Sequence, residues 1–191
     1  MRSSRRFPVT VHPSFFVLTT FLLYSSEDST SLFALIFACL IHESGHLMAA
    51  RSLGLKIDSL HLGLAGLELK IRRNCNYLGD LLLALSGPAA SLLLTALLCA
   101  VPVPAAALLS GISLILGLFN LLPIRPLDGG EALNALLMQL CSEEQAWRYS
   151  RMIGVILVAL CLQAGAVLAA AGNPALLILG LWLLACHLRS S

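Results

Sequence analysis

The apolar block at residues 31–50 reads SLFALIFACLIHESGHLMAA. Its length is that of a helix crossing the hydrocarbon core of a bilayer, which takes about 20 predominantly apolar residues. Inside the block stand His42, Glu43 and His46. Such side chains are costly at membrane depth and mark functional sites there. The block therefore predicts a membrane-spanning helix with a site built into it.

The composition of the whole chain agrees with a membrane protein. Of its 191 residues 58% are hydrophobic and 12% are charged, and the mean hydropathy is +0.88. A soluble domain carries roughly a quarter charged residues because it needs a wettable surface. Most of this surface must therefore face lipid, which excludes a soluble, disordered or coiled-coil protein. An aromatic content of 6% offers no stacking platform for nucleic acid, so we expect no nucleic-acid partner.

Hydropathy divides the chain into six apolar blocks, which we interpret as the six transmembrane helices of an all-α polytopic membrane protein. The blocks are residues 7–24, 31–50, 80–101, 105–122, 152–171 and 174–188. We expect them to form a single domain over residues 1–191. The first and last blocks are short, so they must pack on partner helices, thin the bilayer or enter it part-way. No cleavage signal follows the first block, which predicts an uncleaved anchor.

The basic residues orient these helices. All twelve lie on one side of a six-helix arrangement that has both termini on that side. They are Arg2, Arg5, Arg6, Arg51, Lys56, Lys70, Arg72, Arg73, Arg125, Arg148, Arg151 and Arg189. The positive-inside rule makes that side cytoplasmic. The sequence therefore predicts a multi-pass protein of the cell membrane with cytoplasmic termini.

The histidine pair carries the chemistry. His42 and His46 are four residues apart, so on a helix both imidazoles can reach one cation. The H-E-x-x-H pattern is the signature of zinc hydrolases, in which the histidines are ligands and Glu43 is the general base. The alternative, polar residues that only pack helices together, is disfavoured by the cost of placing three of them in an apolar span. Catalytic zinc uses three protein ligands, so a third is required.

Asp128 is the candidate third ligand. It lies in the stretch NLLPIRPLDGG at 120–130, after the fourth block. Irregular backbone at membrane depth is tolerated only where it lines protein or a wet cavity. The second and fourth blocks run in the same direction, so topology brings both motifs to the cytoplasmic leaflet. The alternative is a turn aspartate before Gly129, since Asp-Gly is common in turns.

Together, HESGH at 42–46 and NLLPIRPLDG at 120–129 resemble the motifs of the site-2 protease family, the M50 intramembrane zinc metalloproteases. The compact six-helix layout resembles the branch of the stage IV sporulation protein FB type, which processes sigma factors. The resemblance implies one Zn²⁺ bound by His42, His46 and Asp128, with Glu43 as catalytic base. It also implies that Asn120 lies near the substrate or the oxyanion.

Two positions depart from the family pattern. The stretch GPAAS at 87–91 ends in Ser91, where relatives often have Asn, and Glu131 follows Asp-Gly-Gly, where they often have a basic residue. Neither position is an implied ligand, so we expect the departures to affect substrate contacts. Relatives of the sporulation branch commonly carry a C-terminal nucleotide-binding domain, and we expect none after residue 191.

The implied function is hydrolysis of a peptide bond in a membrane-embedded or membrane-associated protein, with a pro-sigma or anti-sigma factor as a candidate substrate. The implied partners are a protein substrate with a transmembrane or membrane-associated segment, the lipid bilayer, and a membrane-bound inhibitor or regulator. We expect a bacterial source and an active site near the cytoplasmic leaflet. Two alternatives remain open: a catalytically silent homologue that acts as a membrane binding or regulatory protein, and a divalent-metal transporter.

A small membrane-associated β-hairpin is expected at residues 55–72. The segments LKID at 55–58 and LELKIR at 67–72 alternate apolar and polar residues around GLAG at 63–66, which is typical of paired strands. We hypothesise that its edge pairs with an extended substrate by strand addition. The alternative is an amphipathic loop on the membrane surface.

Outside the motifs, two further expectations concern polar residues at the predicted interface. Arg125 stands in an apolar stretch and is expected to extend toward cytoplasmic water. The stretch SEEQ at 142–145 is a candidate helix start, and Trp147 is expected in an interfacial belt before the fifth block.

Overall fold

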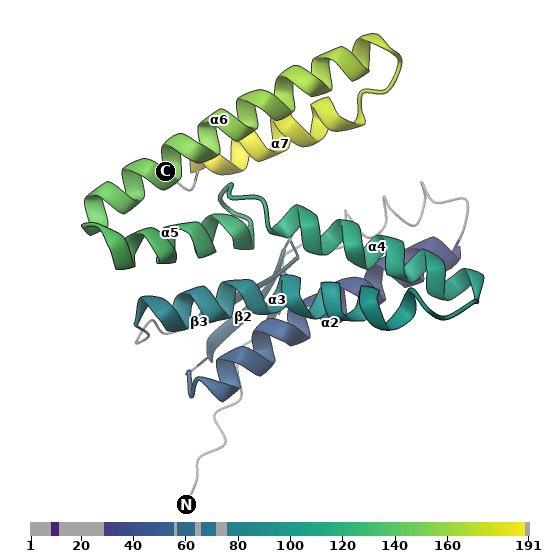
Figure 1. Ribbon diagram of the computed structural model, residues 1–191, viewed down its shortest axis with the longest axis horizontal. Coiled ribbons are helices and arrows are strands. Elements are labelled where there is room, and N and C mark those ends of the chain that lie inside the picture. The colour runs from purple at the N-terminus through teal and green to yellow at the C-terminus, as the bar shows by residue number, and fades with distance from the viewer. Residues whose placement is uncertain (1–8, 12–28, 56, 64–65, 72–75, 190–191) are drawn as a thin grey trace, which may run out of the picture. The chain divides into compact units, whose positions relative to one another are not determined.

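The computed structural model describes residues 9–11, 29–55, 57–63, 66–71 and 76–189 (Figure 1). Its helices and strands are β1 (Val9–Val11), α2 (Ser29–Ser52), β2 (Ile57–Gly63), β3 (Gly66–Ile71), α3 (Tyr77–Leu98), α4 (Pro104–Asn120), α5 (Asp128–Leu140), α6 (Glu143–Ala170) and α7 (Ala175–Arg189). The last five predicted blocks correspond to α2, α3, α4, α6 and α7.

Two compact units make up the chain. Unit 1 comprises Met1–Cys75 and Ala89–Gly117, and unit 2 comprises Asn76–Pro88 and Leu118–Ser191. The boundaries fall inside α3 and near the end of α4, so each of these helices contributes residues to both units. Each unit is described by itself below.

Three described helices are long and apolar enough to cross a membrane, namely Thr30–Ser52, Tyr77–Leu98 and Glu143–Ala170. The apolar helices α4 and α7 are shorter, at 17 and 15 residues. Large apolar side chains are exposed along these helices, for example Phe33 at 71%, Ile115 at 70% and Val167 at 71%. A water-soluble surface does not carry so many large apolar groups, so these helices indicate a membrane protein.

Unit 1 contains a small sheet with the strand order β1-β2-β3. β2 and β3 pair antiparallel, with Leu60 opposite Leu69 and Gly63 opposite Gly66. This pair lies within the range predicted for a hairpin. β1 pairs with β2 in parallel, from Val9 opposite Leu60 onward.

The strand β1 corrects the first predicted block. Residues 7–24 were expected to be one helix, but Val9–Val11 is a strand. The sequence Val-Thr-Val is β-branched throughout, which favours the extended backbone. Hydropathy alone could not separate this strand from a helix, because both are apolar. The rest of the block, from residue 12 on, lies outside the described residues.

Within unit 1, α3 and α4 are joined by hydrogen bonds across the helix pair. The hydroxyl of Thr95 donates to the carbonyl oxygen of Ser110 at 3.2 Å, and the hydroxyl of Ser110 donates to the carbonyl oxygen of Thr95 at 3.3 Å. Between membrane helices, small residues and such polar contacts stabilise association because lipid removes the hydrophobic driving force. This reciprocal contact fixes the register of α4 on α3.

Unit 2 is built on α6 and α7, which run side by side as a hairpin (Figure 1). Its buried core contains Ile124 and Leu127 from the segment before α5, Val158 from α6 and Leu183 from α7. The segment that precedes Asp128 is therefore part of the hydrophobic core of this unit.

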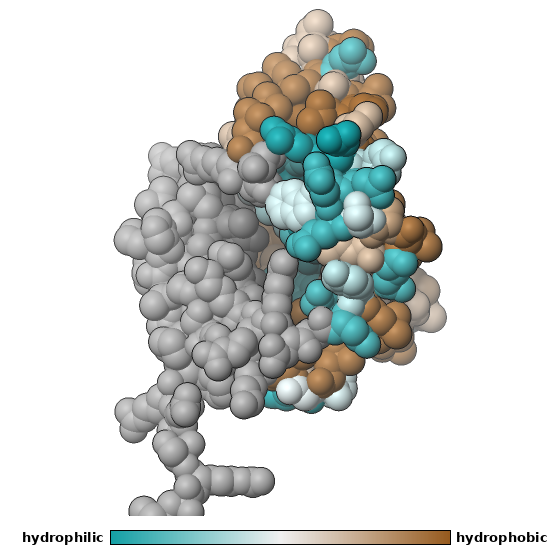
Figure 2. All heavy atoms as spheres, turned by 90° about the vertical axis from the view of Figure 1, so that its left-hand side faces the viewer, coloured by the Kyte–Doolittle hydropathy of each residue, from teal (hydrophilic) through white to brown (hydrophobic). Residues whose placement is uncertain are grey.

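The start of α6 lies nine residues before the predicted start at residue 152. Ser142 accepts a hydrogen bond from the backbone N–H of Gln145, and the Gln145 side chain accepts one from the backbone N–H of Ser142. This capping box satisfies N–H groups that the first helical turn leaves open, and it confirms the predicted helix start. The first turns are polar and exposed, and Figure 2 shows the side of the molecule where α6 begins, with hydrophilic side chains bordered by hydrophobic ones.

The helix α5 was not predicted. It has 13 residues and begins Asp-Gly-Gly-Glu. A search for membrane-spanning blocks misses it because it is too short to span the bilayer and starts with polar residues and glycines.

We predict that Gly165→Ala destabilises unit 2. A Cβ atom at Gly165 would lie 2.6 Å from the backbone nitrogen of Leu177 and 2.7 Å from its Cα, so α6 and α7 would have to separate. Overpacking of this kind costs about 1–3 kcal/mol. Thermal unfolding in detergent micelles measures the change. The control is Gly111→Ala, where a Cβ meets nothing within 4 Å, and equal stability of the two variants would contradict the prediction.

Candidate functional site

The helix α2 carries both predicted histidine ligands on one face. The ring centroids of His42 and His46 are 5.1 Å apart, with an interplanar angle of 74°. The two side chains are 4% and 9% exposed. The i, i+4 spacing thus gives the juxtaposition that the sequence predicted. Two buried imidazoles side by side on one helix can offer two ligands to one metal ion.

Ser91 of α3 contacts the first of these histidines. Its Oγ lies 3.0 Å from Nδ1 of His42, within unit 1. A hydrogen bond at one ring nitrogen selects the tautomer and thereby determines which nitrogen presents a lone pair to a metal. A tautomer in which Nδ1–H donates to Ser91 leaves the lone pair of His42 on Nε2. Sequence reasoning noted Ser91 only as a departure from a pattern, since nothing in the sequence indicates its partner 49 residues away.

Glu43 follows His42 on α2 and precedes His46 by three residues. Residues three apart are neighbours on a helix surface, so the carboxylate borders the face that holds the imidazoles. Its side chain is half-buried. A carboxylate in this position can exchange protons with a group bound beside the histidines.

Asp128 is the first residue of α5 and is half-buried. A helix N-terminus favours a negative charge because its N–H groups point toward it. The two glycines that follow are needed for close packing: a Cβ at Gly130 would lie 2.6 Å from the backbone nitrogen of Arg125. Ile124 is fully buried and Leu127 is 6% exposed, in the core of unit 2. The backbone that holds Asp128 is therefore fixed on both sides.

Asn120 lies at the other end of the same loop. It is the last residue of α4 and is half-buried, in unit 2. Backbone hydrogen bonds follow it closely, from Leu122 N–H to Phe119 oxygen at 3.1 Å and from Ile124 N–H to Leu122 oxygen at 2.7 Å. These turns satisfy polar backbone groups in an apolar setting, where leaving them unpaired is costly.

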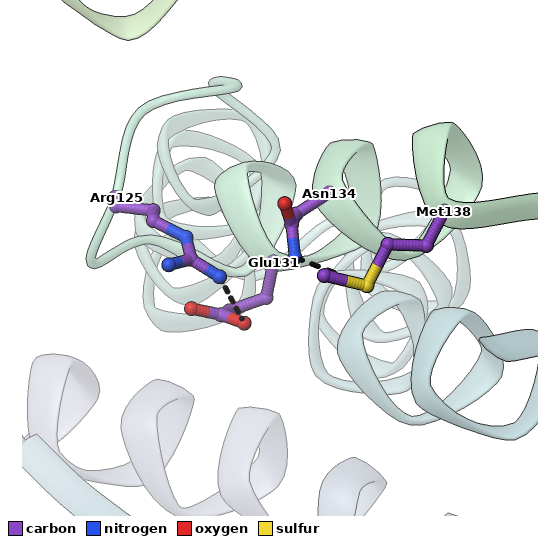
Figure 3. A network of polar contacts seen from close by, with 4 residues as sticks. All are labelled: Arg125, Glu131, Asn134 and Met138. Carbon is purple, nitrogen blue, oxygen red and sulfur yellow. Dashed lines mark hydrogen bonds and ion pairs between the residues drawn. The ribbon is translucent and has the colours of Figure 1, made fainter. Parts of the chain in front are cut away.

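The structure corrects the expectation for Arg125. Its side chain does not extend toward water: the residue is 8% exposed. The guanidinium carbon lies 4.1 Å from the ring centroid of Trp147. Nη2 donates to Oε2 of Glu131 at 3.2 Å, as Figure 3 shows. An aromatic face and a carboxylate together stabilise a buried guanidinium. Trp147, near the start of α6 and 37% exposed, therefore packs its ring against this cation.

This ion pair accounts for the departure at position 131. Glu131 lies one helical turn after Asp128 on α5, and its side chain is 42% exposed against 10% for Arg125. The turns at residues 121–127, which lead into α5 at Asp128, bring positions 125 and 131 together. A basic residue in such a turn and an acidic residue in the first turn of the helix after it are the signal that could have predicted the pair. It fastens the loop before Asp128 to the helix after it.

His42 and His46 of unit 1 and Asp128 of unit 2 are each side chains of a type that can hold a metal ion. Two imidazole nitrogens and one carboxylate oxygen are a donor set that catalytic zinc sites use, with a further position for water. The hydrogen bond of His42 to Ser91 is the kind of outer contact that a ligating histidine makes. The side chains present thus fit a zinc ion.

Comparisons with known proteins bear on this site. The model of Peptidase family M50 matches residues 102–163, which include Asp128. A putative zinc metalloprotease of Synechocystis is 36% identical over 58% of this chain and 32% of that protein. A zinc metalloprotease of Methanocaldococcus jannaschii is 29% identical over 83% of this chain and 51% of that protein. A putative zinc metalloprotease of Mycobacterium tuberculosis is 33% identical over 66% of this chain and 37% of that protein.

The fold also has a counterpart among solved structures. The site-2 protease from Methanocaldococcus jannaschii matches with a TM-score of 0.74 and 23% identity, covering 99% of this chain and 93% of that one. The chain spans between 32% and 51% of the length of the three curated relatives. These comparisons support the family that the two motifs resemble, the site-2 proteases of family M50.

We predict that Glu131→Gln destabilises unit 2 by about 1 kcal/mol, because the amide oxygen can still accept the hydrogen bond but the negative charge that pairs with the buried guanidinium is lost. Unfolding in detergent micelles measures the change. The matched control is Glu144→Gln, which removes the exposed pair with Arg148, whose side chains are 88% and 71% exposed. Exposed pairs of this spacing contribute only about 0.3–0.5 kcal/mol. Equal effects of the two substitutions would show that burial of Arg125 does not matter.

Proposed function

We propose, from membership of the site-2 protease family that the comparisons support, that this chain is an intramembrane zinc metalloendopeptidase. One observation carries the proposal: two buried imidazoles lie 5.1 Å apart on a membrane-length apolar helix, with Glu43 between them in sequence. That arrangement is the zinc-hydrolase motif placed where polar groups are costly. The names of the curated relatives, all zinc metalloproteases, agree with it.

In the proposed site, His42, His46 and Asp128 would hold one Zn²⁺. When bound, zinc polarises the scissile carbonyl and lowers the pKa of a water molecule. Glu43 accepts a proton from the attacking water and delivers it to the nitrogen of the leaving amine, so that the peptide bond breaks to a carboxylate and an amine. Asn120 donates a hydrogen bond to the carbonyl oxygen as negative charge develops there.

The packing of unit 2 supports the role of Asp128. A metal ligand must be held within a fraction of an ångström of its working position. Ile124 and Leu127 anchor the loop in the core, and Arg125 binds it to Glu131 of α5. A loop with these anchors is preorganised, which is what a ligand in an otherwise irregular segment requires.

The proposed setting is the cell membrane of a bacterium. Residues 1–191 form one domain with six spans, both termini are cytoplasmic, and the active site lies near the cytoplasmic leaflet. The apolar helices α2, α3, α4, α6 and α7 supply five of those spans, and the basic residues provide the orientation. The short helices α4 and α7 need partner helices or a locally thinned bilayer.

The proposed substrate is a protein with a transmembrane or membrane-associated segment, and a pro-sigma or anti-sigma factor is the first candidate, as in the sporulation branch. A helical substrate hides its amides in hydrogen bonds and must be extended before cleavage. β3 is the outer strand of the described sheet on the side away from β1, so its edge can pair with an extended substrate. A membrane-bound inhibitor or regulator is the proposed means of control.

We predict that Glu43→Gln abolishes cleavage and keeps zinc, while Asp128→Ala loses both. Loss of a general base lowers the rate by about 10²- to 10⁴-fold. Zinc content is measured by elemental analysis of the purified chain, and cleavage by co-expression with a panel of tagged pro-sigma and anti-sigma factors. Glu144→Gln, an exposed acidic residue on α6, is the control that should change neither.

Two outcomes would contradict this proposal. Equal processing by wild type and Glu43→Gln would exclude Glu43 as the base and favour a silent homologue. Wild-type protein without zinc after purification in zinc-containing buffer would exclude the metal site.

We predict that Ile71→Pro in β3 abolishes cleavage while zinc stays bound. Proline removes a backbone N–H and prevents regular strand pairing. Ile71→Val is the matched control, because it keeps the N–H and the β-branched side chain. Cleavage and zinc content are measured as above. Cleavage by the proline variant at the wild-type rate would refute strand addition at this edge.

A further inference from the structure

We propose that Ser91 is a positioning residue for the metal centre, whose hydroxyl sets the tautomer and ring orientation of His42. The inference rests on the proposed function, because it concerns how that zinc site is held. It starts from one contact: Oγ of Ser91 lies 3.0 Å from Nδ1 of His42, between helices α3 and α2. Ser91 is fully buried and His42 is 4% exposed.

The direction of this hydrogen bond follows from the chemistry of the two groups. A ligating imidazole is neutral, so one ring nitrogen carries a proton and the other carries the lone pair that binds the metal. When Nδ1–H donates to Ser91, the lone pair is on Nε2. A serine hydroxyl oxygen can accept such a bond. Burial keeps water from competing for either group, which strengthens the contact.

The backbone around Ser91 is held in place by α4. The carbonyl oxygen of Ser91 accepts a hydrogen bond from Thr95 Oγ1 at 3.0 Å, and the same hydroxyl reaches Ser110 of α4 at 3.2 Å. A Cβ at Gly117 of α4 would lie 3.1 Å from Cβ of Ser91. The two helices thus approach closely at this point, and they fix the hydroxyl relative to α2. A fixed acceptor is what an orienting contact requires.

The simpler explanation is that Ser91 is only a small packing residue. Ser113 on α4 shows what such a residue looks like in the same unit. It is also fully buried, and its hydroxyl has no hydrogen-bond partner among the described residues. The two serines match in size and burial and differ in the contact with an imidazole. Substituting each serine in turn therefore distinguishes a positioning role of Ser91 from a packing role.

The test compares Ser91→Ala and Ser113→Ala in the full chain, purified in detergent. Zinc affinity is measured by competition with a chromogenic chelator, and the ligand geometry by the visible spectrum of Co²⁺-loaded protein. We expect Ser91→Ala to weaken zinc binding about 10- to 100-fold, the usual effect of losing an outer contact of a ligand, and to change the Co²⁺ spectrum. Ser113→Ala should leave both unchanged.

Two further measurements make the result specific. Ser91→Thr keeps the hydroxyl, so its zinc affinity should stay closer to wild type than that of Ser91→Ala. Unfolding of the metal-free proteins is measured as well, and Ser91→Ala should be the less stable of the two alanine variants, because it removes a hydrogen bond of His42 whereas Ser113 has none to lose. A loss of zinc affinity that Ser91→Thr restores is an effect that packing alone does not produce.

The remaining outcomes overturn the inference. If wild type binds zinc and Ser91→Ala binds it equally, Ser91 does not position His42, and the proposed function stands. If both alanine variants weaken zinc binding to the same extent, the effect is one of packing. If wild type binds no zinc, the proposed function and this inference fail together.

Discussion

The structure depends on the cost of placing polar side chains in an apolar helix. His42, Glu43 and His46 interrupt a helix that is otherwise suited to hydrocarbon, and each buried polar atom must there find a partner or a ligand. This requirement determines what surrounds them. Ser91 meets it for Nδ1 of His42. The helix α3 thus brings a buried hydroxyl to His42 of α2.

The same constraint explains the loop before Asp128. Irregular backbone is tolerated at membrane depth only where its own groups are satisfied within protein. Here consecutive turns bond Ile124 to Leu122 and Leu127 to Ile124, at 2.7 and 2.8 Å, while the side chains of Ile124 and Leu127 enter the core of unit 2. The glycines after Asp128 let this backbone lie directly on the first turn of α5. The prolines and glycines of the motif thus serve packing as much as turn formation.

Features that depend on local periodicity and on segment length were predicted correctly from the sequence. Five of the apolar blocks are helices, and His42 and His46 share a helix face, because span length and the i, i+4 rule are local properties. The strand Val9–Val11, the short helix α5 and the burial of Arg125 were not predicted. Each depends on a partner distant in sequence or on a segment too short for a periodicity test. A lone arginine in an apolar stretch does not reveal that Trp147 lies 22 positions ahead and packs on it.

Ser91 and Glu131 were first noticed as departures from a family pattern, with an expected effect on substrate contacts. In the structure each has a partner within the chain: Ser91 contacts His42, and Glu131 pairs with Arg125. A polar residue near a buried site cannot be replaced freely, since its partner would be left unsatisfied. At position 131, an acidic residue is compatible with the fold because the loop itself supplies the cation. Ser91 therefore helps to hold the histidine motif in place, and Glu131 helps to hold the loop before Asp128. A substitution at position 91 or 131 should be interpreted together with its partner, His42 or Arg125.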